Sequence, residues 1–283
     1  PAATKDILLI AMTLVSAPLY VYFGWLSDRV GRKPVMLGGM LLALALYFPG
    51  SHLIASSVNP ALVEAQAASP VVVHADPSTC SSQFDPTGTR RFDSGCDIAK
   101  SLLIARGISY KIAMPVACDF ELPKTARTSA IISVNDCTFV VPGGEGLSDS
   151  QLKAEKANLG DKVKTWLASV GYPATADPKA VHYPTLLAVL FLFVVAATAL
   201  YGPQAAALVE MFPTKIRYTA MSLPYHVGTG WVGGFLPVTS FAIVAITGDI
   251  YAGLWYAVGF TALSAVVTIL FLKETRGKPL EEC

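Results

Sequence analysis

The sequence predicts an all-α polytopic membrane protein with a small α+β extracytoplasmic domain inserted between its helices. Of the 283 residues, 53% are hydrophobic and only 14% are charged, and the mean hydropathy is +0.51. Soluble domains carry about 25% charged residues. Five runs without Asp, Glu, Lys or Arg reach the length of about 20 residues that a helix needs to cross a bilayer. One polar stretch, residues 57–182, holds 25 of the 41 charged residues.

The uncharged runs divide the chain into three parts. Residues 1–56 contain two predicted transmembrane helices, residues 57–182 form the predicted insert, and residues 183–283 contain three more helices and a tail. Only helices and closed barrels satisfy all backbone hydrogen bonds inside lipid, so we expect each run to be helical. The five predicted spans are 7–26, 34–56, 184–209, 219–247 and 251–272.

The positions of the basic residues predict which side faces the cytoplasm. Eight of the nine basic residues outside the insert fall in three short segments, 27–33, 210–218 and the tail after 272. Five alternating spans place these three segments on one side, and basic loops favour the cytoplasm. We therefore expect a multi-pass protein of the bacterial inner membrane, in contact with the bilayer, with residues 57–182 on the periplasmic face.

Four cysteines in the insert test this orientation independently. Exported domains form disulfides, so we expect two bridges. Three pairings are open, and Cys80–Cys96 with Cys118–Cys137 closes the shortest loops. Successive spacings of 16, 22 and 19 residues are too wide for the close cysteine pairs of a zinc site, so no metal is predicted. Cys283 is predicted to be a free thiol in the cytoplasmic tail.

The sequence patterns of the insert predict a small α+β domain. β-Branched runs predict strands at 71–76, 129–134 and 137–141. Residues 96–106 suit a short helix, and residues 148–170 carry the apolar stripe of an amphipathic helix, with Ser148 as N-cap and Gly171 as stop. We find no catalytic set, so neither an enzyme nor a cofactor is predicted. The insert balances 12 basic against 13 acidic residues, which does not indicate nucleic acid as a partner.

The fourth span has the features expected of a substrate or proton pathway. Pro224 and Pro237 interrupt its hydrogen-bond ladder, and four glycines lie between them. Broken helices with polar groups at mid-membrane are typical of transporter binding sites. His226 can change its charge near neutral pH, although it could equally be a neutral, hydrogen-bonded packing residue. The aromatic residues could stack on a substrate or only fill space. The residues predicted for the pathway are Gln204, Tyr225, His226, Thr229 and Trp231.

The short segment after the third span contains two residues of opposite charge that are predicted to pair. Glu210 lies a few residues before Arg217, and we expect these two side chains to pair across the loop. The alternative is that both are solvated loop charges, because an exposed pair contributes only about 0–1 kcal/mol.

The segment "GWLSDRVGRKPVML" at 24–37 resembles the loop signature of the major facilitator superfamily, G-x-L-[AS]-D-R-x-G-R-[RK]. The family signature connects the second and third helices of each six-helix half. Eight residues match it: Gly24, Leu26, Ser27, Asp28, Arg29, Gly31, Arg32 and Lys33.

Two further segments are similar to the metabolite:proton symporter branch of that superfamily. They are "VEMFPTKIRYTAMSLPYHVGTGWVGGFLP", like the loop and eleventh helix, and "FLKETRGKPLEE", like the end of the twelfth helix. The resemblance covers about 155 residues and implies helices eight to twelve of a secondary transporter. It implies a small-molecule substrate, an organic acid or an osmolyte such as betaine or proline, carried with protons. The N-terminal transporter half would come from the rest of a longer chain or from a partner chain.

The resemblance also implies a gating role for the signature segment. Asp28 would stabilise a neighbouring helix N-terminus through its dipole. Arg29 and Arg32 would pair with acidic groups or lipid phosphates, and Gly24, Gly31 and Lys33 complete the pattern. The alternative is a plain positive-inside anchor. A protein of a different class also remains open, a membrane-anchored extracytoplasmic binding or interaction protein in which residues 57–182 do the work.

Overall fold

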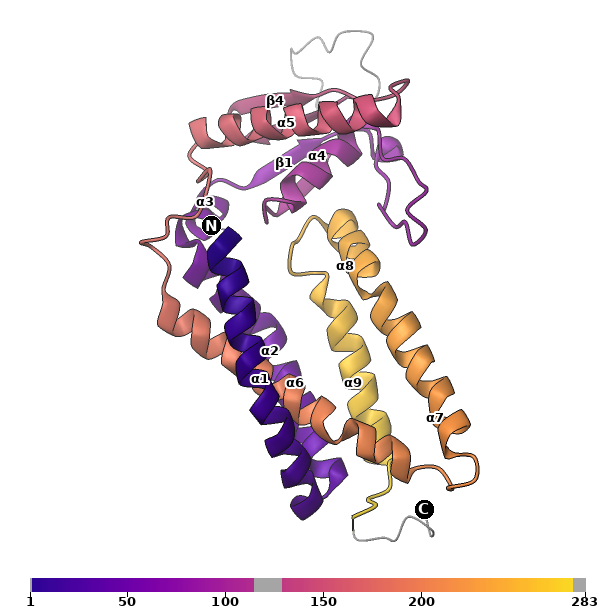
Figure 1. Ribbon diagram of the computed structural model, residues 1–283. Helices are drawn as coiled ribbons and strands as arrows, with labels where there is room; N and C mark the ends of the chain where they lie inside the picture. Colours follow the sequence, from indigo (N-terminus) through magenta and orange to yellow (C-terminus); the bar gives the residue numbers. More distant parts are fainter. Residues whose placement is uncertain (1, 115–128, 277–283) are drawn as a thin grey trace. The chain divides into compact units, whose positions relative to one another are not determined.

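The computed structural model describes residues 2–114 and 129–276, arranged as two compact units (Figure 1). The helical unit consists of Pro1–Val58, His182–Leu236 and Tyr256–Cys283. The sheet unit consists of Asn59–Val181 together with Pro237–Trp255. The five long apolar helices that could cross a membrane, among the described residues, are Asp6–Val30, Arg32–Val58, Tyr183–Glu210, Arg217–Thr247 and Leu254–Phe271.

Three long helices of the helical unit pack directly on one another. They are α1 (Ala2–Val30), α2 (Arg32–Val58) and α6 (Tyr183–Glu210), and α6 contacts both of the others. A Cβ placed on Gly39 of α2 would lie only 2.9 Å from the carbonyl oxygen of Ala196. Elsewhere on α6, a Cβ on Gly202 would lie 3.3 Å from the backbone nitrogen of Gly24 in α1. Small residues at these crossings therefore let the backbones approach closely, as is typical of membrane helices.

The fourth apolar run is not a single regular helix. It consists of α7 (Arg217–His226), a π-helical segment η2 (Val227–Gly233) and α8 (Gly234–Thr247). The π-helical segment coincides with the glycine-rich stretch, where side chains do little to hold α-helical geometry. The predicted interruption of this helix is therefore present as a change of winding. The chain then turns into α9 (Leu254–Phe271), which ends the described helices.

The sheet unit contains a four-stranded sheet in the order β2-β1-β3-β4. Its strands are β1 (Val71–His74), β2 (Tyr110–Ala113), β3 (Ala130–Val134) and β4 (Cys137–Val141). β1 pairs in parallel with β2, and the other two pairings are antiparallel. The remaining elements are α3 (Pro60–Ala68), the 3₁₀ turn η1 (Pro77–Thr79), α4 (Gly95–Ile104) and α5 (Asp149–Ser169). α4 lies in the crossover that a parallel strand pair requires.

One core joins the sheet to α4 and α5. Val71 and Val73 of β1 alternate into it, as do Ile132 and Val134 of β3, and all four are at most 1% exposed. Ile98 and Leu103 come from α4, and Leu159 and Val163 come from α5. The buried, alternating residues of the strands and the apolar stripe of α5 thus form one apolar layer.

Most elements of the sheet unit lie near their predicted positions. Ser148 caps α5, and its side chain forms a reciprocal capping box with Gln151. Gly171, with φ +93°, follows the end of that helix. The sequence patterns missed α3 and β2, which are short and lack a distinctive periodicity.

The sheet unit also includes the turn between α8 and α9, which the predicted boundaries did not anticipate. The backbone N–H of Tyr110 donates to the carbonyl of Gly248 at 2.8 Å, and its hydroxyl donates to the carbonyl of Ala245 at 3.2 Å. Gly248 has φ +74°, and a Cβ there would collide with the carbonyl oxygen of Tyr110. These contacts join two segments more than 130 residues apart in the chain.

Candidate functional site

The signature segment forms a tight corner between two helices. α1 ends at Val30 and α2 begins at Arg32, so Gly31 alone makes the turn. Its φ of +116° lies in the region that side-chain-bearing residues rarely adopt. The Gly31 N–H donates to the carbonyl of Ser27 at 3.0 Å. A Cβ on Gly31 would lie 2.5 Å from Oε2 of Glu274, so the carboxylate occupies the space that a side chain would need.

Arg32 joins this corner to the end of α6. Its Nη2 lies 3.1 Å from Oε1 of Glu210, and its Nε lies 3.5 Å from Oε2 of the same carboxylate. Its Nη1 donates to Ser27 Oγ at 2.6 Å and to Asp28 Oδ1. The Arg32 and Glu210 side chains are only 15% and 17% exposed. A charge-assisted pair that is largely shielded from water is stronger than a surface pair.

Glu274, just after α9, caps the start of α2. Its two carboxylate oxygens accept from the backbone N–H groups of Arg32 at 3.0 Å and Lys33 at 3.1 Å. The first N–H groups of a helix lack internal partners and attract negative charge, so this placement stabilises the helix start. Burial raises the pKa of the Glu274 carboxyl, but four backbone N–H donors outweigh it and hold that pKa below its usual value.

Two further bonds tie the three helix ends together. Lys33 Nζ donates to the carbonyl of Ile269 in the last turn of α9 at 2.8 Å. The Thr275 hydroxyl donates to Glu210. We call the resulting set the Arg32 cluster, and it consists of Ser27, Asp28, Arg32, Lys33, Glu210, Glu274 and Thr275.

One predicted pairing is wrong, and one role expected of Asp28 is taken by another residue. Glu210 pairs with Arg32 and not with Arg217, whose Nε donates to the carbonyl of Phe212 at 3.0 Å. Asp28 pairs with Arg32 one turn away, whereas Glu274 takes the position at the helix N-terminus. The tail after α9 lies against the first turn of α2, where Glu274 accepts two backbone hydrogen bonds. The spacing of residues along the sequence does not reveal this contact. Glu274 and Thr275 were not predicted as site residues, although both lie in the segment "FLKETRGKPLEE" that resembles the end of the twelfth helix.

The remaining residues of the signature segment lie at the periphery. Arg29 places its guanidinium carbon 4.0 Å from the ring centroid of Trp25, a cation–π contact. The backbone of Gly24 lies near Gly202 of α6, but a Cβ added to Gly24 would meet nothing within 4 Å.

The predicted pathway residues cluster only partly. Tyr225, His226, Thr229 and Trp231 lie along the end of α7 and on the π-helical segment η2, and all four are exposed. Thr229 Oγ1 donates to the carbonyl of Tyr225 at 2.7 Å, and the Tyr225 and His226 rings meet edge to face. Within the described residues, no hydrogen bond or ring contact joins them to Gln204 on α6.

Tyr256 of α9 supports the irregular segment. Its hydroxyl donates to the carbonyl of Val232 at 2.9 Å, which satisfies one backbone group at the end of the π-helical segment. The Trp231 ring lies 6.5 Å from that of Phe235, also edge to face.

One predicted disulfide is present. Cys80 and Cys96 are bridged, with their Cα atoms 5.3 Å apart. Cys137 is exposed and forms no bridge to another described cysteine, whereas Cys118, its predicted partner, and Cys283 lie outside the described residues. The second bridge therefore stays a prediction.

A buried ion pair lies beside this disulfide, and sequence reasoning missed it. Lys100 is 1% exposed, and its Nζ lies 3.8 Å from Oδ1 of Asp97 and donates to the carbonyl of Ser81. Asp97 also accepts from the Ser81 N–H at 2.9 Å. Burial lowers the pKa of Lys100, and Asp97 opposes this shift. The pair fastens the chain after Cys80 to α4.

The fold and the Arg32 cluster define a polytopic membrane protein whose helix ends are joined by charged groups. Residues 164–283 match the family model described as "Sugar (and other) transporter". This match covers less than half of the chain, and together with the relatives below it supports the resemblance to metabolite:proton symporters of the major facilitator superfamily.

Three relatives share part of the sequence. A glycine betaine/proline/ectoine/pipecolic acid transporter of Dickeya dadantii is 30% identical over 32% of this chain and 18% of its own length. Citrate-proton symporters of Klebsiella pneumoniae and Salmonella typhi are 35% and 34% identical, over 25% and 27% of this chain and 16% and 18% of their own lengths. This chain therefore spans less than a fifth of these relatives. No solved structure matches.

Proposed function

We propose that this chain is the C-terminal part of a secondary active transporter that moves a small metabolite together with protons. The substrate class is an organic acid or an osmolyte, in keeping with the citrate and betaine transporters among the relatives. The observation that carries the proposal is the Arg32 cluster, which ties the signature segment to the ends of α6 and α9.

The Arg32 cluster is proposed to hold the cytoplasmic side closed in one state of the cycle. Its bonds join groups on three helices, so they must break if those helix ends separate. Packed helix ends of this kind have discrete arrangements rather than a continuous range. Gly24 and Arg29 belong to the same segment but make none of the bonds between the three helices that we describe.

The pathway is proposed to run past the irregular fourth helix. Tyr225, His226, Thr229 and Trp231 would meet substrate or protons there, with Gln204 contributed by α6. Their exposure in this chain supports the idea, because a surface that lines a pathway must be completed by other helices. Those helices would come from an N-terminal half or from a partner chain.

Residues 57–182 are proposed to be an inserted α+β domain on the periplasmic face of the bacterial inner membrane. The basic residues on the opposite side and the Cys80–Cys96 bridge support this sidedness.

Uptake by the full-length protein in membrane vesicles tests the proposed function. We expect accumulation of labelled citrate or glycine betaine that collapses when an uncoupler removes the proton gradient. We expect Trp231→Ala and His226→Ala to reduce uptake at least tenfold, whereas Phe241→Ala, which removes an exposed aromatic side chain of α8, should leave it nearly unchanged. Uptake that ignores the uncoupler would contradict proton coupling, and unaffected variants would contradict the pathway.

A membrane-anchored binding protein is the second candidate, favoured by a cavity in the sheet unit. It predicts that deletion of residues 59–181 abolishes function while Trp231→Ala has no effect. The leading proposal predicts a strong effect of Trp231→Ala.

A further inference from the structure

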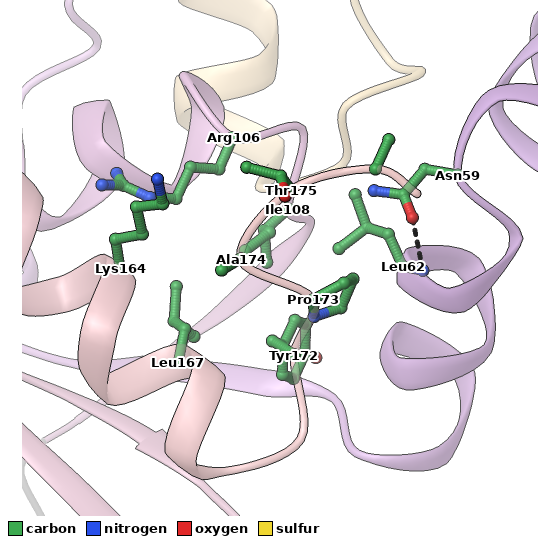
Figure 2. Close-up of a pocket in the computed structure, with 11 residues that line it drawn as sticks. Asn59, Leu62, Arg106, Ile108, Lys164, Leu167, Tyr172, Pro173, Ala174 and Thr175 are labelled. Atoms are coloured by element: carbon green, nitrogen blue, oxygen red, sulfur yellow. Dashed lines mark hydrogen bonds between the residues drawn. The ribbon is translucent and has the colours of Figure 1, made fainter. Parts of the chain in front are cut away.

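A cavity of about 210 Å³ lies entirely within the sheet unit. Figure 2 shows its walls, which come from the start of α3, the turn after α4, α5 and the segment 172–176. Its size is below the roughly 300–1,000 Å³ of drug-sized sites, so it suits a ligand of about ten heavy atoms.

The charged side chains of this cavity are both cationic. Arg106 and Lys164 carry positive charge, and none of the lining residues is a carboxylate. Asn59 Oδ1 accepts from the Leu62 N–H at 3.2 Å, which leaves the amide nitrogen of Asn59 as a donor, turned away from α3 in Figure 2. Thr175 adds a hydroxyl, which can donate or accept.

The two cationic side chains are placed by different elements. Arg106 is held by bonds from Nη1 to the carbonyl of Leu102 at 2.8 Å and from Nη2 to the carbonyl of Gly160, and its remaining N–H groups can serve other acceptors. Lys164 reaches the same end of the cavity from α5 (Figure 2). Burial lowers the pKa of Arg106, and the nearby Asp161 opposes that shift without lining the cavity. An anion between the two cations would be attracted by both.

The rest of the cavity is apolar. Ile108 and Leu167 are buried, and Leu62 packs against the same core. We propose that this cavity binds a small organic monoanion, with its carboxylate between Arg106 and Lys164 and its apolar body against Leu62, Ile108 and Leu167. A doubly charged or fully polar anion would leave this apolar wall unused.

Benzoate is a suitable probe, with benzamide as a neutral molecule of the same shape. We expect titration calorimetry on the full chain in lipid nanodiscs to give saturable benzoate binding with a Kd below about 1 mM, and at least tenfold weaker binding of benzamide. Lys164→Gln should weaken benzoate about tenfold, because one charge-assisted contact is lost. Lys164 is exposed, so this variant should keep the wild-type melting temperature.

Lys162→Gln is the matched control, because it removes the same charge from the same helix outside the cavity. It should change the benzoate Kd less than twofold. Equal binding of benzamide and benzoate, equal effects of the two lysine variants, or no saturable binding would each overturn the proposal. The calorimetry measures benzoate binding alone, so its outcome does not depend on whether the protein transports a substrate.

Discussion

At the scale of single residues, Arg32 and Glu274 carry the most specific interactions of the helical unit. Arg32 faces two carboxylates and one hydroxyl at once, which uses the forked guanidinium in a way that a lysine could not reproduce. Glu274 lies 242 positions further along the chain and binds the backbone of Arg32. The same arginine is therefore held by its side chain at α6 and by its backbone at the end of α9.

The Glu274 carboxylate should stabilise the fold in a pH-dependent way. Its pKa is lowered in the folded state from an ordinary value of 4.5, so its contribution is present above that value and is lost as the pH falls through the lower, folded pKa. We expect Glu274→Gln to lower the free energy of unfolding by about 0.3–1 kcal/mol at pH 7, the range for a charge at an exposed helix N-terminus. Melting temperatures of the full chain at pH 7 and near pH 3 measure this difference.

Glu64→Gln provides the comparison, because it removes an exposed carboxylate on α3. That variant should melt like the wild type at pH 7. If Glu274→Gln lost as much stability near pH 3 as at pH 7, the carboxylate charge would not be the source of the stabilisation.

At the scale of elements, the corner between α1 and α2 depends on one glycine. Gly31 meets two separate requirements, a positive φ and room for the Glu274 carboxylate. In the irregular fourth helix, several glycines instead accompany a change of helix type. There, the stretch between Pro224 and Pro237 relaxes into π-helical winding, and Tyr256 bonds one of its carbonyls.

Gly31→Ala should destabilise the helical unit by about 2 kcal/mol. Alanine would be held at an unfavourable φ, which costs about 1–3 kcal/mol, and its Cβ would displace Glu274. Thermal unfolding of the full chain measures the loss. Gly24→Ala is the matched control in the same signature, and it should be neutral or slightly stabilising because its Cβ meets nothing within 4 Å.

The double variant Gly31→Ala with Glu274→Gln separates the two requirements. We expect its loss to be smaller than the sum of the single losses, because both changes disrupt the same contact. Strict additivity would mean that only the backbone conformation matters.

At the scale of the whole molecule, the chain enters the sheet unit twice. It passes through Asn59–Val181 and returns with Pro237–Trp255, where Gly248 and Ala245 accept hydrogen bonds from Tyr110. An insert that was attached only at its two ends would not make these bonds. The turn between α8 and α9 is therefore part of the sheet unit, and we expect both to lie on the same side of the membrane.

Thiol labelling of cells tests this sidedness. With Cys118 and Cys283 replaced by serine, a membrane-impermeant maleimide should label the exposed Cys137 in intact spheroplasts. In a background that also carries Cys137→Ser, Lys215→Cys should react only after permeabilisation, because residue 215 is exposed in the turn after α6 on the predicted cytoplasmic side. The reverse pattern would contradict the proposed orientation.

Restoring Cys118 in the same experiment decides the second disulfide. Continued labelling of Cys137 would exclude a Cys118–Cys137 bridge, whereas labelling that is lost only when Cys118 is present would establish it.

Local patterns in the sequence predicted most of the helices and strands, although not α3 and β2, and they did not predict which elements contact one another. Apolar runs, alternation in 71–74 and 130–134, and the Ser148 capping box act over a few residues, so they can be read without the fold. The tertiary structure alone decided that Glu210 meets Arg32, that Glu274 caps α2, and that Arg106 and Lys164 share a cavity. These contacts join residues 58 to 242 positions apart, and such distances are set by how helices and strands pack rather than by the spacing of residues along the chain.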